Sequence, residues 1–214
     1  MSDFSVAAIF SSHMVLQRNK PVCFFGTGKD GLIVTVSLFA SNKNLIAKNN
    51  TLVSKGRWEI TLPPQSAQNN CTVIVSAGTA AGSDNNGSFT FTDVALGEVW
   101  LAGGQSNMEF ELHNCTEGPA ELNDKNNKPN VRFYYTNKIS WIDEKFYEAE
   151  RNTSWQTWES ENKTAWSAVG YFFAKKLSQD LDCTVGIIGC NWGGTSASAW
   201  MRQEFLEKDL ELCT

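Results

Sequence analysis

Apolar and polar residues alternate over short segments in the first 94 residues, which is the pattern of half-buried β-strands. The alternation is clearest in Arg57–Leu62, where Trp58, Ile60 and Leu62 fall on one face. Other short segments are rich in β-branched and aromatic residues and are separated by Gly, Asn, Pro and Lys: "PVCFFGTG" (21–28), "LIVTVSLFA" (32–40), "CTVIVSAG" (71–78) and "SFTFTDV" (88–94). Short strands at regular spacing predict a small β-sandwich-like domain over residues 1–94.

The pattern changes after Asp93. The segments "VALGEVWLAGG" (94–104) and "CTVGIIGCNWGG" (183–194) are too apolar for a half-exposed sheet, and "VRFYYTN" (131–137) is a further predicted strand. Residues 165–181 have helical spacing that predicts an apolar face of Val169, Phe172, Phe173 and Leu177.

Two segments of this half lack clean periodicity. Residues 117–130 are polar and rich in helix breakers, and residues 140–164 carry several tryptophans among polar groups, so both predict irregular loop. The order strand, loop, strand, helix, strand predicts an α/β domain with a largely parallel sheet over residues 95–214.

Two predicted strands of this domain end in glycine followed by small polar residues. Ser106 follows Gly103 and Gly104, and Thr195 follows Gly193 and Gly194. Reactive groups gather at the carboxyl ends of parallel strands, where glycine lets the backbone approach a substrate. A serine at such a turn can act as a nucleophile and present its own N–H to an oxyanion.

A purely structural interpretation of Ser106 remains open. The serine could cap the following helix, with Glu109 three residues later completing a capping box. No G-x-S-x-G motif supports an ordinary α/β-hydrolase, and "GTGKDG" (26–31) lacks the following helix of a phosphate-binding loop.

Composition narrows the class of partner. The chain has 214 residues, 42% of them hydrophobic, and a net charge of −5 without a basic cluster, so neither nucleic acid nor an anionic membrane is expected as partner. No apolar run has the roughly 18 residues of a spanning helix, and the first residues do not resemble a signal peptide.

Other features suggest a glycosylated protein that is secreted or lysosomal. Six N-x-Ser/Thr sequons predict glycosylation at Asn49, Asn70, Asn86, Asn114, Asn152 and Asn162. The six cysteines could form disulfides or remain buried thiols, and their spacing selects no pairing. With two histidines and no C-x-x-C motif, a metal site is not expected.

Four sequence blocks stand out when they are taken together. In chain order, the blocks are "FSSHMVLQRNKPVCFFGTG" (10–28), "GRWEITLPP" (56–64), "GEVWLAGGQSNMEFEL" (97–112) and "SAVGYFFAKKLSQDLDCTVGIIGCNWGGTSASAWM" (167–201). They resemble the motif blocks of the sialate O-acetylesterase family of SGNH-type hydrolases, keep the family's order and span nearly the whole chain.

The resemblance implies a hydrolase of O-acetyl esters on sialic acid or related sugars, without a cofactor. It implies a β-sandwich-like region joined to an incomplete flavodoxin-like, three-layer hydrolase domain. Ser106 falls on the family's nucleophile and first oxyanion N–H. The second donor falls on Gly194, in preference to Gly193. Gln105, Asn107 and Thr195 fall beside them, as residues expected to contact the acyl or sugar group.

The histidines do not complete this site. His13 lies in a motif that looks structural, and His113 is seven residues after Ser106, about 10 Å along a helix and too far for a direct hydrogen bond. The family's "G-E-x-N"-like and "D-x-x-H" blocks, which supply a third donor and the base, are absent from these 214 residues.

Three explanations of the missing blocks stay open. The chain could be one part of a processed enzyme whose second polypeptide carries the remainder, a truncated product, or a shortened variant that binds glycans without cleaving them. Since a serine without a base is a poor nucleophile, we expect the chain alone to be inactive.

Overall fold

The first part of the chain is built from short strands. The computed structural model describes residues 4–79, 85–139 and 142–208. Before residue 80 the strands are β1 (Phe4–Val6), β2 (Val15–Gln17), β3 (Val22–Gly28), β4 (Ile33–Phe39), β5 (Leu45–Leu52), β6 (Arg57–Leu62) and β7 (Gln68–Gly78). The predicted alternation is confirmed in β6, in which Trp58, Ile60 and Leu62 are buried and the residues between them are exposed.

These strands form two sheets that share a hydrophobic core. One sheet has the order β1-β3-β6, and the other contains β5, β4 and β7, all with antiparallel neighbours. Phe24 and Trp58 of the first sheet and Val36 and Val75 of the second belong to one cluster of buried side chains. The two sheets therefore pack against each other across this cluster.

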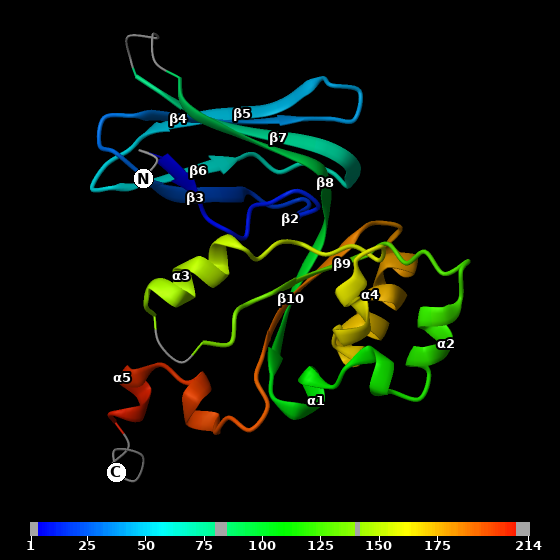
Figure 1. The fold of residues 1–214 in the computed structure, drawn as a ribbon. Coiled ribbons are helices and arrows are strands. Elements are labelled where there is room, and N and C mark those ends of the chain that lie inside the picture. The colour runs from blue at the N-terminus through cyan, green and yellow to red at the C-terminus, as the bar shows by residue number, and fades with distance from the viewer. Residues whose placement is uncertain (1–3, 80–84, 140–141, 209–214) are drawn as a thin grey trace.

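A single long strand leads from this region into the second half of the chain. Strand β8 (Asn85–Gly104) first pairs antiparallel with β7, then parallel with β2 at Ala95–Gly97, and then parallel with β10 (Val185–Asn191) from Glu98 onward (Figure 1). The predicted division between residues 94 and 95 falls inside β8, one residue after Asp93, which has a φ of 51°. Two hydrophobic clusters are present, but the first also takes in Tyr134 and Trp155 from beyond β8, so the division between residues 94 and 95 stays a prediction.

The sheet of the second half is parallel, as predicted. Strand β10 lies between β8 and β9 (Val131–Tyr135) and runs parallel to both. Helix α4 (Ala168–Leu181) covers one face, and its first turn is capped by Ser167, whose hydroxyl accepts a hydrogen bond from the Gly170 N–H. Mixed helices and strands, with parallel pairing in this half, make the chain an α/β protein.

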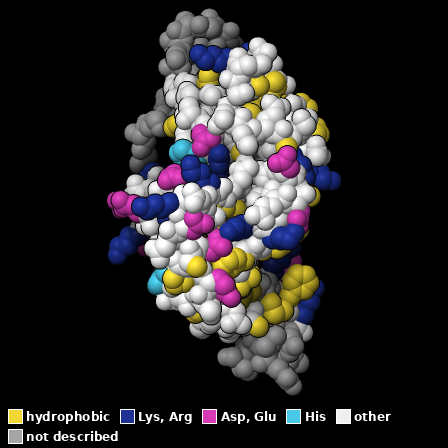
Figure 2. All heavy atoms as spheres, turned by 90° about the vertical axis from the view of Figure 1, so that its right-hand side faces the viewer, with side chains coloured by type: hydrophobic (Ala, Val, Ile, Leu, Met, Phe, Trp, Pro, Cys, Tyr) yellow, Lys and Arg dark blue, Asp and Glu magenta, His cyan; other side chains and the backbone are white. Residues whose placement is uncertain are grey.

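The predicted apolar face of α4 is confirmed for Phe172 and Leu177, which are partly buried against the core of this half, and is wrong for Val169 and Phe173. Val169 and Phe173 are 50% and 43% exposed, whereas the small residues Gly170 and Ala174 are buried with Tyr171. A Cβ atom on Gly170 would lie 3.3 Å from the Phe133 ring, so small side chains let the helix approach the sheet. Figure 2 shows that side of the molecule, with acidic and basic side chains interspersed over it.

The two segments predicted as loops contain helices. These are α2 (Gly118–Asn123), α3 (Glu144–Arg151) and the 3₁₀ turn η2 (Glu161–Ala165). Helix α3 buries no side chain, and Asp143 caps it by accepting a hydrogen bond from the Phe146 N–H at 3.0 Å. The remaining short helices are α1 (Ser106–Glu109), η1 (Leu112–Asn114), η3 (Ala197–Trp200) and α5 (Gln203–Leu206). No helix of the described segments is long and apolar enough to cross a membrane.

Candidate active site

Ser106 lies at the carboxyl end of β8. The strand ends at Gly104, which has a φ of 145°, and Ser106 is the first residue of α1. Its side chain is exposed, and within the described residues its hydroxyl forms no hydrogen bond. The capping-box interpretation is wrong, because Gln105 occupies the cap position and no side chain caps this helix.

The second glycine turn lies directly beside Ser106. Parallel pairing sets Asn191 opposite Gly104, and the Trp192 N–H donates to the Gly104 carbonyl oxygen at 3.0 Å. A Cβ atom built on Gly193 would lie 3.5 Å from the Ser106 Oγ. The sheet therefore brings together the two loops that the sequence singled out.

A side-chain contact joins the two loops a second time. The Gln105 side-chain amide donates to the Thr195 carbonyl oxygen at 2.8 Å, and the Thr195 hydroxyl donates to the Trp192 carbonyl oxygen at 2.8 Å. Gln105 and Thr195 thus hold the turn in place, whereas Asn107 is exposed and its side chain makes no hydrogen bond within the described residues. Their contact with substrate stays a prediction.

The two glycine N–H groups differ in what they contact. The Gly193 N–H donates to the Glu109 carboxylate, which also pairs with Lys138. Lys138 and then the Gly193 N–H hold the pKa of Glu109 below its usual value, against the opposing effect of burial. Gly194 has a φ of 76°, and its N–H forms no hydrogen bond within the described residues.

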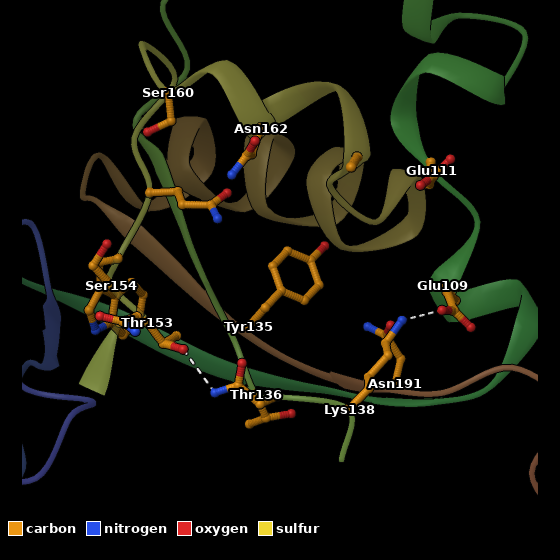
Figure 3. A pocket seen from close by; sticks show the side chains of 15 residues that line it. Glu109, Glu111, Tyr135, Thr136, Lys138, Thr153, Ser154, Ser160, Asn162 and Asn191 are labelled. Atoms are coloured by element: carbon orange, nitrogen blue, oxygen red, sulfur yellow. Dashed lines mark hydrogen bonds and ion pairs between the residues drawn. The ribbon is translucent and has the colours of Figure 1, made fainter. Parts of the chain in front are cut away.

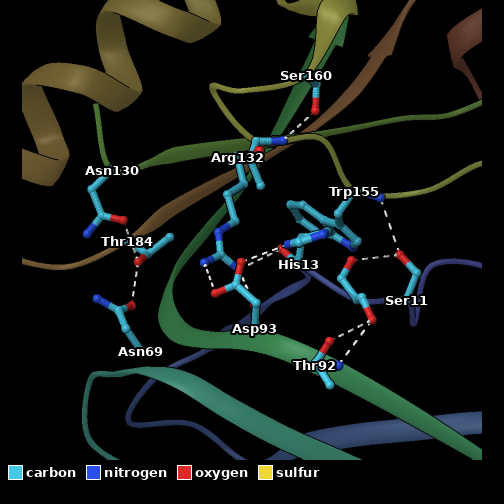
Figure 4. Close-up of polar contacts among 12 residues, drawn as sticks. Ser11, His13, Asn69, Thr92, Asp93, Asn130, Arg132, Trp155, Ser160 and Thr184 are labelled. Atoms are coloured by element: carbon cyan, nitrogen blue, oxygen red, sulfur yellow. Dashed lines mark hydrogen bonds and ion pairs between the residues drawn. The ribbon is translucent and has the colours of Figure 1, made fainter. Parts of the chain in front are cut away.

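Both histidines are engaged away from Ser106. His13 Nδ1 donates to Asp93 Oδ2 at 2.7 Å, and Arg132 donates to Asp93 Oδ1 at 2.8 Å and to the His13 carbonyl oxygen at 2.9 Å (Figure 4). This cluster joins the segment before β2 to β8 and β9. His113 Nδ1 donates to the Thr164 carbonyl oxygen at 2.9 Å. In the described part of the chain, then, neither histidine contacts the Ser106 hydroxyl.

A polar cavity of about 680 Å³ opens beside this site. It lies between the carboxyl ends of β9 and β10 and the segment that follows α3 (Figure 3). Glu109 and Asn191, both adjacent to the Gly193 turn, line one end, and Thr153 and Ser154 lie at the other, with the Tyr135 ring between them. Burial raises the pKa of Tyr135 to about 12, so its hydroxyl stays protonated at neutral pH.

Sequence reasoning missed three residues of this region. Glu109 entered only as a capping residue, and Lys138 and Asn191 were not considered. One sequence feature does point to Asn191: it is the last residue of a predicted apolar strand and directly precedes the Trp-Gly-Gly turn.

The sequon asparagines are sterically open where the structure describes them. Asn49, Asn70, Asn114, Asn152 and Asn162 are exposed, and the side chain of Asn86 lies outside the described residues. Glycosylation at all six stays a prediction. The cysteines before residue 209 are free thiols, and Cys213 is not among the described residues. No group of three or more His, Cys, Asp or Glu side chains in the described segments could hold a metal ion.

Comparisons with known proteins agree on one class. A family model described as carbohydrate esterase, sialic acid-specific acetylesterase matches residues 96–210. The sialate O-acetylesterase of Mus musculus is 26% identical over 215 residues, and that of Homo sapiens is 26% identical over 204 residues. These alignments cover 95% and 92% of this chain and 38% of each relative, so the chain spans well under half of their length.

A solved structure has a similar fold. It is a carbohydrate acetylesterase from Xanthomonas citri, with a TM-score of 0.75 and 24% sequence identity. The superposition covers 98% of this chain and 45% of the other.

Proposed function

The chain belongs to the sialic acid-specific acetylesterase family of carbohydrate esterases, and on that premise we propose that it carries the nucleophile of a sugar O-acetylesterase. Ser106 attacks the acetyl carbonyl carbon, the sugar hydroxyl leaves, and water then releases acetate from the acetyl-enzyme. The proposal rests mainly on the exposed Ser106 hydroxyl beside the Gly193–Gly194 turn at the carboxyl edge of a parallel sheet.

The oxyanion donors in this mechanism are the N–H groups of Ser106 and Gly194. The Gly193 N–H is a poor candidate because the ionised Glu109 already accepts its hydrogen bond. A developing oxyanion at the same N–H would lie next to a carboxylate and be repelled by it. The free N–H of Gly194 has no such competitor in the described residues.

The general base is supplied from outside these 214 residues. In the described segments the Ser106 hydroxyl has no histidine partner, and no Asp is followed three residues later by His in the sequence. A second polypeptide, or a longer form of the chain, fills this role in the proposal. The outer edge of β8 over Glu98–Gly104 supports an additional segment of polypeptide at this place. Among the described residues no strand pairs with this edge, and Leu101 of β8 is 69% exposed.

An acetyl-ester assay tests the function. We expect negligible turnover of 4-nitrophenyl acetate by the 214-residue chain, and measurable turnover by a longer version that includes the family's Asp/His block. A fluorophosphonate probe should label Ser106 in the longer version and should leave its Ser106→Ala variant unlabelled. Strong activity of the short chain, or labelling at another residue, would contradict the proposal.

A glycan-binding module without catalysis is the second candidate, and the missing base at Ser106 favours it. The tryptophans of 140–166 offer this candidate little surface for stacking on sugars, because Trp155, Trp158 and Trp166 are buried; Trp141 lies outside the described residues. Glycan binding without any covalent label at Ser106 in the longer version would select this candidate.

The exposed sequons support the further proposal that the protein is glycosylated, and secreted or lysosomal. Its substrate is an O-acetylated sugar, and no nucleic acid or cofactor enters the mechanism.

A further inference from the structure

Asn191 presents a buried amide that lacks a partner. The residue is 5% exposed, and its Nδ2 forms no hydrogen bond within the described residues. Native proteins leave few buried polar groups unpaired, because each one costs the free energy of its lost hydration. The side chain lines the cavity beside the Gly193 turn, so a bound molecule in that cavity could accept its hydrogen bond.

The cavity is suited to a ligand with several hydroxyl groups. Its volume of about 680 Å³ falls in the range of small-molecule sites. The Tyr135 hydroxyl accepts a hydrogen bond from the Ser167 N–H at 2.7 Å, which leaves its own hydrogen to donate. The Gln156 side-chain oxygen accepts from the Trp166 ring N–H at 2.6 Å, and its amide nitrogen makes no hydrogen bond within the described residues.

The charges in the cavity argue against an anionic ligand. Glu109, Glu111 and Lys138 are the ionisable acids and bases that line it, and Lys138 is already paired with Glu109. The lining therefore carries a net negative charge at neutral pH. A carboxylate or phosphate entering the cavity would be repelled, whereas neutral hydroxyl groups would not be.

The cavity is also placed to serve Ser106. Asn191 and Glu109 line its near end, and both adjoin Gly193, whose Cβ position is 3.5 Å from the Ser106 Oγ. A sugar in the cavity would thus lie next to an acetyl group held at the serine.

We propose that this cavity is the sugar subsite and that it takes an uncharged, hydroxyl-bearing part of the O-acetylated substrate. Asn191 is a specificity-determining residue, whose side-chain amide donates a hydrogen bond to a sugar oxygen. The inference rests on the proposed function. It adds that any carboxylate of the sugar stays outside the cavity.

The test uses the 214-residue chain and two matched probes. These are 9-O-acetyl-N-acetylneuraminic acid and its methyl ester, which differ in one charge, and binding is measured by saturation-transfer NMR titration. We expect the ester to bind at least as tightly as the acid. Threefold tighter binding of the acid, or no binding of either probe at its solubility limit, would overturn the proposal.

The variant Asn191→Leu keeps a similar shape and removes the amide. We expect it to weaken binding of the ester about 10-fold, and to leave the Tm unchanged or higher because an unpaired buried amide is lost. The matched control is Asn126→Leu, the same change at an exposed residue that does not line the cavity, with less than about a twofold effect expected. A fall in Tm with Asn191→Leu would show that the amide stabilises the fold. An equal loss of binding in both variants would show that Asn191 does not recognise the sugar. Either result refutes its proposed role.

Failure of this inference is distinguishable from failure of the proposed function. If the probes bind but Ser106 is not labelled in the longer version, the esterase mechanism is wrong and the subsite stands. If Ser106 is labelled but Asn191→Leu binds normally, the subsite assignment is wrong and the mechanism stands.

Discussion

The contact between Glu109 and Gly193 predicts how much the carboxylate stabilises the site. In Glu109→Ala the Gly193 N–H loses its acceptor and Lys138 loses its partner. A hydrogen bond to a charged group contributes about 1.5–3 kcal/mol. Because the Glu109 and Lys138 side chains are 34% and 38% exposed, solvent screens the pair, and we expect the lower end, about 1.5 kcal/mol.

Thermal unfolding measures this loss. For a chain of this length, about 1.5 kcal/mol corresponds to a fall in Tm of about 3–6 °C. Glu109→Gln retains a side-chain oxygen that can accept from the Gly193 N–H, so its loss should be below about 1 kcal/mol. An alanine variant with the wild-type Tm would refute the reasoning, as would a glutamine variant that loses as much as the alanine variant.

The pH dependence gives the same contact a second test. The pKa of Glu109 is lowered in the folded state, chiefly by Lys138, from an ordinary value of 4.5. Its stabilisation is therefore complete above the unfolded pKa and disappears as the pH falls through the folded pKa. The stability difference between wild type and Glu109→Gln should be constant above about pH 5.5 and shrink below about pH 4.5. A difference that grows on acidification would contradict the assigned direction.

Three further predictions concern the contacts of β8 with its neighbours and the open edge of that strand. A Cβ atom in Gly97→Ala would overlap the Thr184 carbonyl oxygen, so we expect this variant to yield no soluble folded protein. The control is Gly31→Ala, whose Cβ meets nothing within 4 Å; it should fold and lose only about 1 kcal/mol of stability through its φ of 91°. Circular dichroism of the two variants measures the difference. Asp93→Ala leaves the Arg132 guanidinium, 10% exposed, without its carboxylate, which should cost about 2 kcal/mol in urea unfolding because Asp93 is itself 33% exposed. Alanine at the left-handed φ of 51° adds about 1 kcal/mol. A total cost below about 0.5 kcal/mol would show that Asp93 does not stabilise the contact between β8 and β9. We expect the chain to self-associate through the open edge of β8, and Leu101→Lys there should reduce this association in sedimentation velocity. Association that is unchanged in the variant would show that another surface is responsible.

Local pattern was sufficient for elements in which one face is buried. Strand β6 alternates because its neighbour and the core lie on fixed sides, so Trp58, Ile60 and Leu62 could be assigned from spacing. Parallel pairing of β8 and β10 also followed, since both come from long apolar segments that lead into a glycine turn. The position of Ser106 at a sheet edge was therefore predictable.

The helices show where local pattern fails. In α4 apolar residues occur around most of the circumference, so spacing alone did not select the face. Contact with the sheet selected it: a Cβ atom on Gly170 would lie 3.3 Å from the Phe133 ring, and the small residues Ala168, Ala174 and Ser178 are buried on the same helix. Helix α3 was missed for a different reason. None of its side chains is buried, and the only local feature that marks its start is the Asp143 cap.

The site residues that the sequence did not reveal share one property: the local sequence around each of them fits more than one structural role. A carboxylate three residues after the start of a helix serves equally well to cap that helix or to reach a neighbouring turn. For Glu109 the outcome was decided by Gly193, which is 84 residues away and is brought near by the pairing of β10 with β8. Asn191 is similar, since an asparagine at the end of a strand can hydrogen-bond to the backbone of the following turn. Here its amide nitrogen lies beside a cavity and has no protein acceptor among the described residues. The backbone pattern thus places Ser106, while the side chains around it depend on which strands become neighbours, and that depends on the packing of the whole sheet.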